Sequence, residues 1–382
     1  MPKRVSALHG SADRRRCICF GFSFWKRDFV RAFLKNECVG DSILFLSSLK
    51  EALEVGVSSV DRVYVWGFRE SRELAAYFEE SSIAPIRVED GFLRSVSLGS
   101  DLSRAYSLVF DREGIYYDPR SESSLERILK ERAFDDDMLR RARRLRENIV
   151  KSAISKYNAS RETLPKLPPK ARGKRVLFVP GQVEDDASVV LGAGGMENGE
   201  LLRRVRDSSP DSFIIYKAHP DVEAGNRRGE LSSDILKRYA DMVLSDISAP
   251  SVLDICDEVH TMTSLVGFEA LLRGKRVVTY GIPFYAGWGL TEDRVECSRR
   301  GVKLSLDELT AGALLIYPRY IDPVDMELCE AEDVLEALKK EKSRYNENRV
   351  YRFMKVCRNT VVRAAQRGVR IFGGEQNRKD RE

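Results

Sequence analysis

Two adjacent carboxylates, Glu89 and Asp90, end a short apolar segment and are followed by Gly91. A carboxylate pair can provide a base or a nucleophile, because repulsion between the like charges raises the pKa of one member. Arg94 lies four residues beyond Asp90, and a guanidinium binds a carboxylate substrate through two parallel hydrogen bonds. The competing interpretation is an acidic surface turn in which Gly91 adopts a positive φ.

Lys217 and His219 leave an apolar segment together, and Pro220 restricts the backbone directly after them. Both side chains can donate charge-assisted hydrogen bonds, so the pattern favours an anion such as phosphate. A solvated turn is the alternative. His260 lies beside another strand end, but a lone histidine is more often structural, and we expect that role for it.

Thr261, Thr263 and Ser264 directly precede an apolar segment with a helical period. Hydroxyls at this place ordinarily cap a helix, yet the same helix end offers N–H groups and a positive dipole to a phosphate. Glu269 falls on the second turn, where it either reaches a sugar hydroxyl or faces solvent. Gln182 follows a predicted strand, so it is expected at the same edge of the sheet.

Short apolar segments alternate with amphipathic helical segments, which predicts parallel sheets covered by helices, the α/β class. Predicted strands cover 17–22, 42–48, 60–68, 83–91, 175–181, 212–220, 257–262 and 276–281, and predicted helices cover 25–35, 49–56, 71–82, 125–148, 199–208, 234–245 and 267–274. Residues 107–118 are predicted to form a hairpin around Glu113-Gly114. The polar clusters all fall at strand ends, where ligands of such sheets bind.

A chain of 382 residues is too long for one ordinary core and fits two domains of roughly 150 residues. The boundaries indicated are an N-terminal domain over 1–164, a proline-rich basic linker over 165–174, a C-terminal domain over 175–325 and a helical basic segment over 326–382. The basic tail 349–370 suits either an anionic membrane surface or packing against the protein, and packing is slightly favoured.

The composition excludes few classes of protein but limits the partners. The 64 basic and 59 acidic residues leave a formal charge of +5, which is too small to indicate nucleic acid. The seven cysteines show no paired C-x-x-C spacing, and no leader or membrane-spanning segment is recognised, so a reducing cytosol is expected. The acidic run 184–186 lacks histidine at ligand spacing, so no metal site is expected.

Eight long segments together resemble the capsule polysaccharide β-Kdo transferases of the KpsC/LipB type. They run in order from Gly21 to Val324: GFSFWKR, EDGFLRS, SLVFDREGIYYD, VPGQVEDDAS, YKAHPDVEAGNRRG, DEVHTMTSLVGFEALLRGK, YGIPFYAGWGLTED and YPRYIDPV. The resemblance implies the GT-B fold, in which two Rossmann-like domains face each other across a cleft. It also implies retaining transfer of Kdo from CMP-β-Kdo to a Kdo-bearing glycolipid, as part of capsular polysaccharide linker synthesis.

The resemblance also assigns roles within these motifs. Asp90 matches the catalytic aspartate, favoured here as a nucleophile over a base, and Glu89 supports it in an unresolved way. The implied donor-binding residues are Lys217, His219, Pro220, Ser264, Glu269 and Gln182, to which the charge argument adds Arg94. No cofactor or metal is expected.

The implied partners are CMP-Kdo, a lipid-linked glycan acceptor and the capsule assembly machinery, with the protein cytoplasmic or peripheral on the inner face of the inner membrane. Typical members carry two transferase modules, whereas this sequence matches one. Two alternatives stay open, namely a sialyl-type CMP-sugar transferase and a non-catalytic GT-B module that binds glycolipid in capsule assembly.

Overall fold

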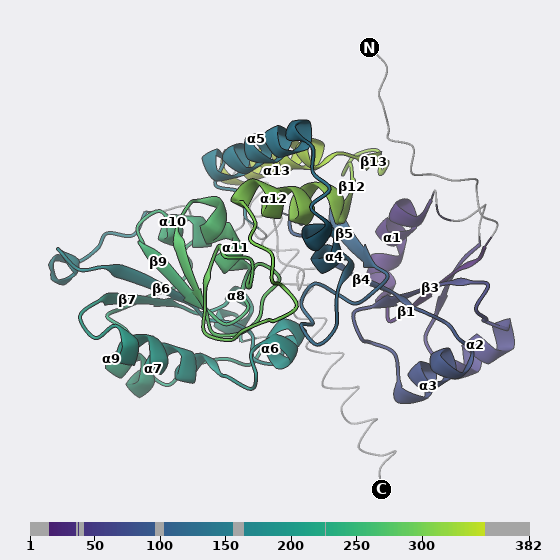
Figure 1. Cartoon of the computed structure of the whole chain (residues 1–382), viewed down its shortest axis with the longest axis horizontal. Coiled ribbons are helices and arrows are strands. Elements are labelled where there is room, and N and C mark those ends of the chain that lie inside the picture. Colours follow the sequence, from purple (N-terminus) through teal and green to yellow (C-terminus); the bar gives the residue numbers. More distant parts are fainter. Residues whose placement is uncertain are drawn as a thin grey trace, which may run out of the picture.

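Two β-sheets, each covered by helices, make up a computed structural model of the protein (Figure 1). The structure describes residues 15–35, 37, 42–95, 103–155, 164–225 and 227–347. The predicted basic tail 349–370 lies outside these residues.

The first sheet contains both parallel and antiparallel strands. Its order is β13-β12-β5-β4-β3-β1-β2, in which β2, β1, β3 and β4 run parallel while β5, β12 and β13 pair antiparallel. The strands are β1 (Cys17–Phe20), β2 (Ile43–Leu46), β3 (Arg62–Trp66), β4 (Ile86–Asp90), β5 (Ser107–Asp111), β12 (Pro318–Ile321) and β13 (Leu328–Cys329).

Side-chain caps fix where the helices around this sheet begin. Ser48, Ser71, Ser123 and Asp135 each accept a hydrogen bond from a backbone N–H of the first helical turn, which satisfies a donor that has no partner within the helix. The helical elements are η1 (Phe24–Lys26), α1 (Arg27–Leu34), α2 (Leu49–Val55), α3 (Arg72–Glu80), α4 (Ser124–Glu131) and α5 (Asp136–Lys151).

The second sheet is parallel throughout, in the order β11-β10-β9-β6-β7-β8. Its strands are β6 (Val176–Pro180), β7 (Phe213–Lys217), β8 (Met242–Leu244), β9 (Glu258–Thr261), β10 (Arg276–Thr279) and β11 (Glu292–Asp293). The helical elements from the linker onward are η3 (Pro169–Ala171), which lies within the linker, α6 (Ala187–Gly192), α7 (Asn198–Ser208), α8 (Pro220–Glu223), α9 (Ser233–Tyr239), α10 (Ala249–Leu253), α11 (Leu265–Leu272), α12 (Leu306–Thr310), η4 (Ala311–Ile316) and α13 (Ala331–Glu347).

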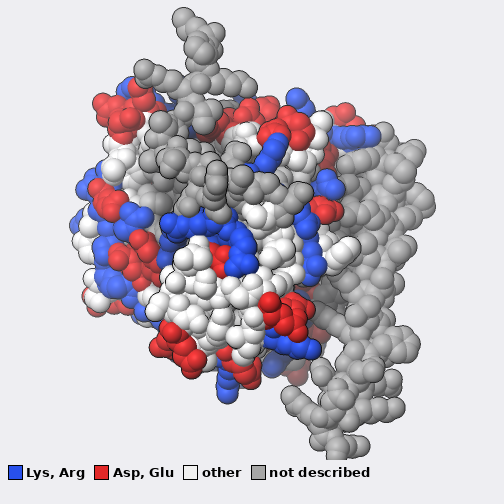
Figure 2. Space-filling model, turned by 90° about the vertical axis from the view of Figure 1, so that its right-hand side faces the viewer, with Lys and Arg blue, Asp and Glu red and all other residues white. Residues whose placement is uncertain are grey.

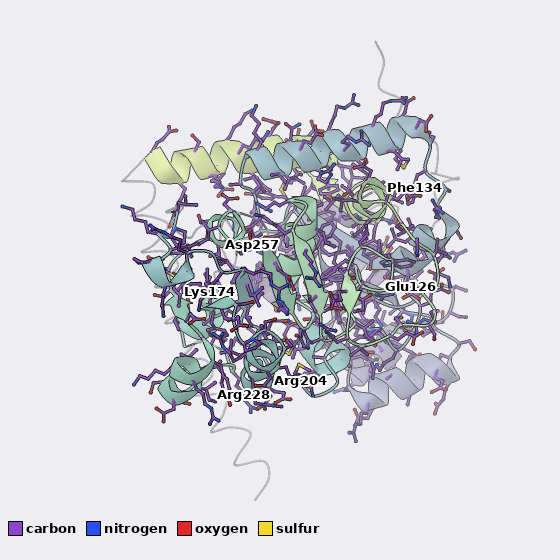
Figure 3. All side chains as sticks on the ribbon, turned by 60° about the vertical axis from the view of Figure 1, so that its left-hand side comes forward. Glu126, Phe134, Lys174, Arg204, Arg228 and Asp257 are labelled. Carbon is purple, nitrogen blue, oxygen red and sulfur yellow. The ribbon has the colours of Figure 1, made fainter. Side chains whose placement is uncertain are left out.

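The end of the chain returns to the first sheet, which differs from the predicted domain boundary at 325. Strand β12 pairs antiparallel with β5, and β13 extends the same edge. Helix α13 then lies along α5 at the top of the molecule (Figures 1 and 3), where Arg141 forms ion pairs with Glu330 and Glu332. The C-terminal domain therefore ends before β12, because the strand completes a sheet begun by the N-terminal residues.

Three predicted elements are also corrected. Residues 107–118 do not form a hairpin, because β5 pairs with β4 and β12 while the Asp111 carboxylate accepts the N–H groups of the following turn. The helix predicted over 125–148 is divided at Arg132, which has a φ of 52°. The helix predicted over 234–245 ends at Tyr239, and β8 follows it.

One hydrophobic cluster spans both sheets, with Val109 from the first sheet and Val259 from the second among its buried members. Among the described cysteines, Cys17 is disulfide-bonded, whereas Cys19, Cys256, Cys297 and Cys329 are free. No helix within the described ranges has the length and apolar character to cross a membrane. Acidic and basic side chains are interspersed over the described part of the face in Figure 2.

Candidate functional site

Asp90 is the last residue of β4, at the carboxyl end of the parallel part of the first sheet. Its Oδ2 accepts a 2.7 Å hydrogen bond from Arg94 Nε. Two further bonds hold the guanidinium, from Nη1 to Ser95 Oγ at 2.7 Å and from Nη2 to the Ser103 carbonyl at 3.1 Å. A charged side chain held at three points is a rigid support for the carboxylate that it contacts.

The surroundings of Arg94 do not fit the binding of a substrate carboxylate, which was the role predicted for it. Its side chain is 0% exposed, whereas that of Asp90 is 15% exposed. A guanidinium buried this completely, with Asp90, Ser95 and Ser103 as partners, does not offer the fork that a substrate carboxylate needs. Arg94 is therefore a positioning residue for Asp90.

Gly91 is needed for close packing and not for a positive φ, which corrects the turn interpretation. A Cβ at this position would lie 2.4 Å from Ser107 Oγ and 2.7 Å from Ser107 Cβ. Ser107 stands at the start of β5 and donates its hydroxyl hydrogen bond to the Leu93 carbonyl at 2.5 Å. The turn after Asp90 is thus pressed against the neighbouring strand.

Glu89 supports the same strand end through the backbone. Its Oε1 accepts a 3.0 Å hydrogen bond from the Asp90 N–H. Tyr117 lies nearby, since burial and then the charge of Glu89 raise the pKa of its phenol. Both residues also pack close to Gly67, where a Cβ would lie 3.0 Å from the Tyr117 hydroxyl and 3.6 Å from Glu89 Oε2.

Lys26 is a site residue that the sequence reasoning did not single out. It ends η1, is 7% exposed, and places its Nζ 3.0 Å from the centroid of the Trp66 ring. Burial lowers the pKa of the ammonium to about 8, a shift partly offset by the charges of Asp90 and Glu89. Its place just beyond a strand end, inside the GFSFWKR segment, was the signal available for finding it.

Lys217 ends β7 in the second sheet, as predicted. Its side chain is buried, its Nζ donates to the Ala218 carbonyl at 3.1 Å, and Glu223 Oε1 lies 3.9 Å away. Burial lowers the pKa of Lys217, while the charge of Glu223 opposes that shift. The binding of a phosphate by Lys217 stays a prediction.

His219 and Pro220 begin α8. The Nδ1 atom of His219 accepts a 3.1 Å hydrogen bond from the Asp221 N–H, and Pro220 occupies the first helical position. A neutral His219 that accepts at Nδ1 carries its proton on Nε2, so the outer nitrogen is the donor. This tautomer is the one that a phosphate ligand would require.

Gln182 organises the strand ends of the second sheet. Its Oε1 accepts hydrogen bonds from Thr261 Oγ1 at 3.1 Å and from the Thr263 N–H at 3.0 Å, while Nε2 donates to Thr263 Oγ1 at 2.9 Å. Its backbone exchanges two hydrogen bonds with the Asn198 amide. Both ends of the buried Gln182 side chain are therefore used to hold the loop after β9.

Ser264 and Glu269 belong to α11. Ser264 caps the helix by accepting the Val266 N–H at 3.2 Å, and its carbonyl accepts a 2.5 Å bond from the Tyr285 hydroxyl. Glu269 is buried on the second turn, so the solvent-facing alternative is wrong. The donor contacts predicted for both residues stay predictions.

Aromatic side chains connect the strand-end residues of the first sheet with those of the second. Phe92 follows Asp90 by two residues and stacks on Phe284 at 4.7 Å between ring centroids, with Phe268 at 6.0 Å. Phe268 precedes Glu269 in α11. The loop after β4 is therefore packed directly onto α11, the helix that Ser264 caps.

His260 has a structural environment, as expected. Its Nε2 lies 2.8 Å from Glu258 Oε1, and its Nδ1 lies 3.3 Å from the Tyr280 hydroxyl. Within the described residues, no group of three or more histidine, cysteine, aspartate or glutamate side chains is arranged to hold a metal ion. The absence of a cofactor stays a prediction.

Comparison with known proteins gives relatives along most of the sequence. The chain matches the family described as "Capsule polysaccharide biosynthesis protein" over residues 61–170 and 161–320. It is 42% identical over 338 residues to the capsule polysaccharide modification protein LipA of Neisseria meningitidis serogroup A, covering 88% of this chain and 47% of LipA. It is 40% identical to the lipopolysaccharide-processing protein LpsZ of Rhizobium meliloti, covering 82% and 73%. The chain thus spans about half the length of LipA.

Two solved structures from Thermosulfurimonas dismutans share the fold. The KpsC β-Kdo 2,7 transferase has a TM-score of 0.70 at 37% identity, covering 86% of this chain and 100% of that chain. The KpsC β-Kdo 2,4 transferase has a TM-score of 0.73 at 30% identity, covering 85% and 98%. The predicted GT-B fold with two Rossmann-like domains is confirmed, and the chain belongs to the capsule polysaccharide biosynthesis protein family.

Proposed function

We propose that this protein is a retaining β-Kdo glycosyltransferase, which moves Kdo from CMP-β-Kdo to a Kdo-bearing glycolipid in capsular polysaccharide linker synthesis. The observation that carries the proposal is the 37% identity to a solved β-Kdo transferase whose whole length this chain covers. The rigid support of Asp90 by Arg94 agrees with a group that must meet a reacting carbon in one orientation.

Retention of configuration follows from two successive displacements at the anomeric carbon. In the first, an Asp90 carboxylate oxygen forms a bond to that carbon while the bond to phosphate breaks, and CMP leaves with the electron pair. In the second, an acceptor hydroxyl attacks the same carbon and releases Asp90. The hydroxyl proton passes to a base, for which Glu89 is the candidate.

The second sheet supplies the binding of the leaving group. Negative charge develops on the phosphate as CMP departs, so donors that already face it lower the barrier. Lys217, the Nε2–H of His219 and the α11 terminus at Ser264 are the candidates. Glu269 would contact the ribose, and the Gln182 network would hold the loop that carries Ser264.

The first experiment incubates the protein with CMP-Kdo made in situ and no acceptor, followed by mass spectrometry of its peptides. We expect the mass of one Kdo on the peptide that contains Asp90, and no adduct in Asp90→Asn. Addition of a Kdo-capped lipid-like acceptor should then discharge the adduct and give a product whose linkage can be assigned.

Each outcome bears on a different part of the proposal. Turnover without an adduct would contradict the nucleophile and favour Asp90 as a base. Transfer from CMP-sialic acid with none from CMP-Kdo would replace the donor. Unchanged transfer by Asp90→Asn would remove Asp90 from the mechanism, and no product with any Kdo-terminated acceptor would overturn the function.

A further inference from the structure

Protonated Lys26 and the charged groups around it together carry one more positive than negative charge. Lys26 is coupled electrostatically to the carboxylates of Asp90 and Glu89 and to the guanidinium groups of Arg94 and Arg69. When Lys26 is protonated, three cations thus face two carboxylates. A single negative charge brought into this group by a ligand would balance it, whereas a neutral ligand would leave a buried charge uncompensated.

Lys26 differs from Arg94 in that its ammonium is available to bind a ligand. Arg94 is tied to Asp90, Ser95 and Ser103. The Lys26 ammonium forms no hydrogen bond or ion pair with another residue in the described part of the chain, and its contacts are the faces of Trp66 at 3.0 Å and Trp25 at 5.4 Å. Aromatic faces attract a cation but leave its N–H groups able to donate elsewhere.

The backbone fixes Lys26 at this place. Gly21, directly after β1, has a φ of 76°, and a Cβ there would lie 2.7 Å from the Arg69 Cβ. The sharp turn at Gly21 leads into η1, whose last residue is Lys26, and its ammonium lies on Trp66, the last residue of β3. Lys26 is therefore held across the strand ends, on the same edge of the sheet as Asp90.

We infer that Lys26 binds the carboxylate that the donor sugar carries on its anomeric carbon. The inference rests on the proposed function. In a 2-keto sugar acid the carboxyl group is bonded to the carbon that Asp90 would attack, so its binding residue must lie beside Asp90. Lys26 meets that requirement by its position and charge, and takes the role that the sequence had suggested for Arg94.

The test compares Lys26→Met with wild type and with Lys50→Met. Methionine keeps an unbranched apolar chain on Trp66, and Lys50 is an exposed lysine on α2 that serves as the matched control. We expect Lys26→Met to lower kcat/KM for CMP-Kdo on the order of 30-fold, mostly through KM, because a charged hydrogen bond is lost. Affinity for CMP alone, which lacks the carboxylate, should stay within about 2-fold.

A pH profile separates this role from a structural one. Since the ammonium of the free enzyme has a pKa of about 8, kcat/KM of wild type should fall as the pH rises above that value and the positive charge is lost. The charged groups that face Lys26 are Asp90, Glu89, Arg94 and Arg69. Lys26→Arg should move the fall to higher pH, and Lys26→Met should abolish it.

The outcomes distinguish the inference from the function. The inference alone is overturned if wild type transfers Kdo and the kcat/KM of Lys26→Met stays within 3-fold of the wild-type value. It is also overturned if kcat/KM falls only in Arg69→Met. If wild type does not use CMP-Kdo, the proposed function fails, and calorimetric titration with CMP-sialic acid and free Kdo decides the inference. Binding by wild type that Lys26→Met lacks supports the carboxylate site, and the absence of such a difference overturns it.

Discussion

At the scale of single residues, the structure separates groups that support the site from groups that can meet a substrate. Arg94 and Gln182 are buried with their hydrogen-bonding atoms directed to protein partners. The charge of Lys26 lies on an aromatic ring and interacts with the charges of nearby side chains. Sequence spacing places Arg94 and Gln182 at strand ends, but all three side chains are buried, and only their hydrogen-bond partners tell which of them remains available for a ligand.

Arg94→Lys should therefore reduce kcat more than donor affinity. Lysine keeps the charge but loses the planar fork that contacts Asp90, Ser95 and Ser103 together. We expect kcat to fall about 10- to 100-fold with the donor KM within about 3-fold, as measured by CMP release. A raised KM with an unchanged kcat would restore the substrate-binding role first predicted for Arg94.

At the scale of elements, the sequence was sufficient for most strands and for their class. Apolar segments such as the one ending at Asp90 and the one ending at Lys217 were predicted, because buried strands need continuous apolar residues. The edge strand β8 was merged with α9, since the half-exposed segment from Met242 to Leu244 carries a weak strand pattern. The pairing of β12 with β5 was missed because it joins residues about 210 apart, which local patterns do not report.

The same limit applies to the candidate site. The motif residues could be placed at strand ends from sequence, but the contact of Phe92 with Phe284 and the burial of Arg94 depend on packing between distant segments. Lys26 was overlooked because a lysine near the chain start resembles an ordinary surface residue. Its burial against Trp66 arises only when β1 and β3 pair.

Gly91→Ala tests how closely β4 and β5 must approach. The new Cβ would meet Ser107 at 2.4 Å, so the turn after Asp90 or the strand β5 must shift. We expect a loss of about 1–3 kcal/mol in the free energy of unfolding in urea. Ser107→Gly removes both atoms in the way, so the double variant should recover much of the loss, and simple additivity of the two single effects would contradict the packing argument.

At the scale of the whole molecule, a buried ion-pair cluster ties α4 to the loops of the second sheet. Glu126, labelled in Figure 3, accepts hydrogen bonds from Arg299 Nε and Arg300 Nε, each at 3.0 Å. Arg300 also donates to the Pro283 and Ala286 carbonyls, on either side of Phe284. Since Phe284 stacks on Phe92, this cluster connects α4 to the turn that carries Asp90.

Glu126→Gln should therefore destabilise the protein and disturb the site together. Removing the carboxylate leaves two arginines facing a neutral amide, one of them only 3% exposed, which costs about 3–5 kcal/mol in a buried pair. The matched control is Glu113→Gln, which breaks a half-exposed pair with Arg127 and should cost about 0–1 kcal/mol. Urea unfolding at pH 7 measures both, and equal losses would contradict the argument.

The direction in which pH changes the contribution of Glu126 to stability follows from the pKa of its carboxyl group. Burial raises the pKa of Glu126, but the hydrogen bonds and charges of Arg299 and Arg300 outweigh it and hold that pKa below its ordinary value. An acid whose folded pKa is depressed contributes stability above its unfolded value and loses it as the pH falls through the folded one. The stability gap between wild type and Glu126→Gln should therefore be full at pH 6 to 7 and narrow below about pH 4. A gap that stays constant down to acid unfolding would show that the two arginines do not depend on the Glu126 charge, and the link from α4 to Asp90 would then be one of packing alone.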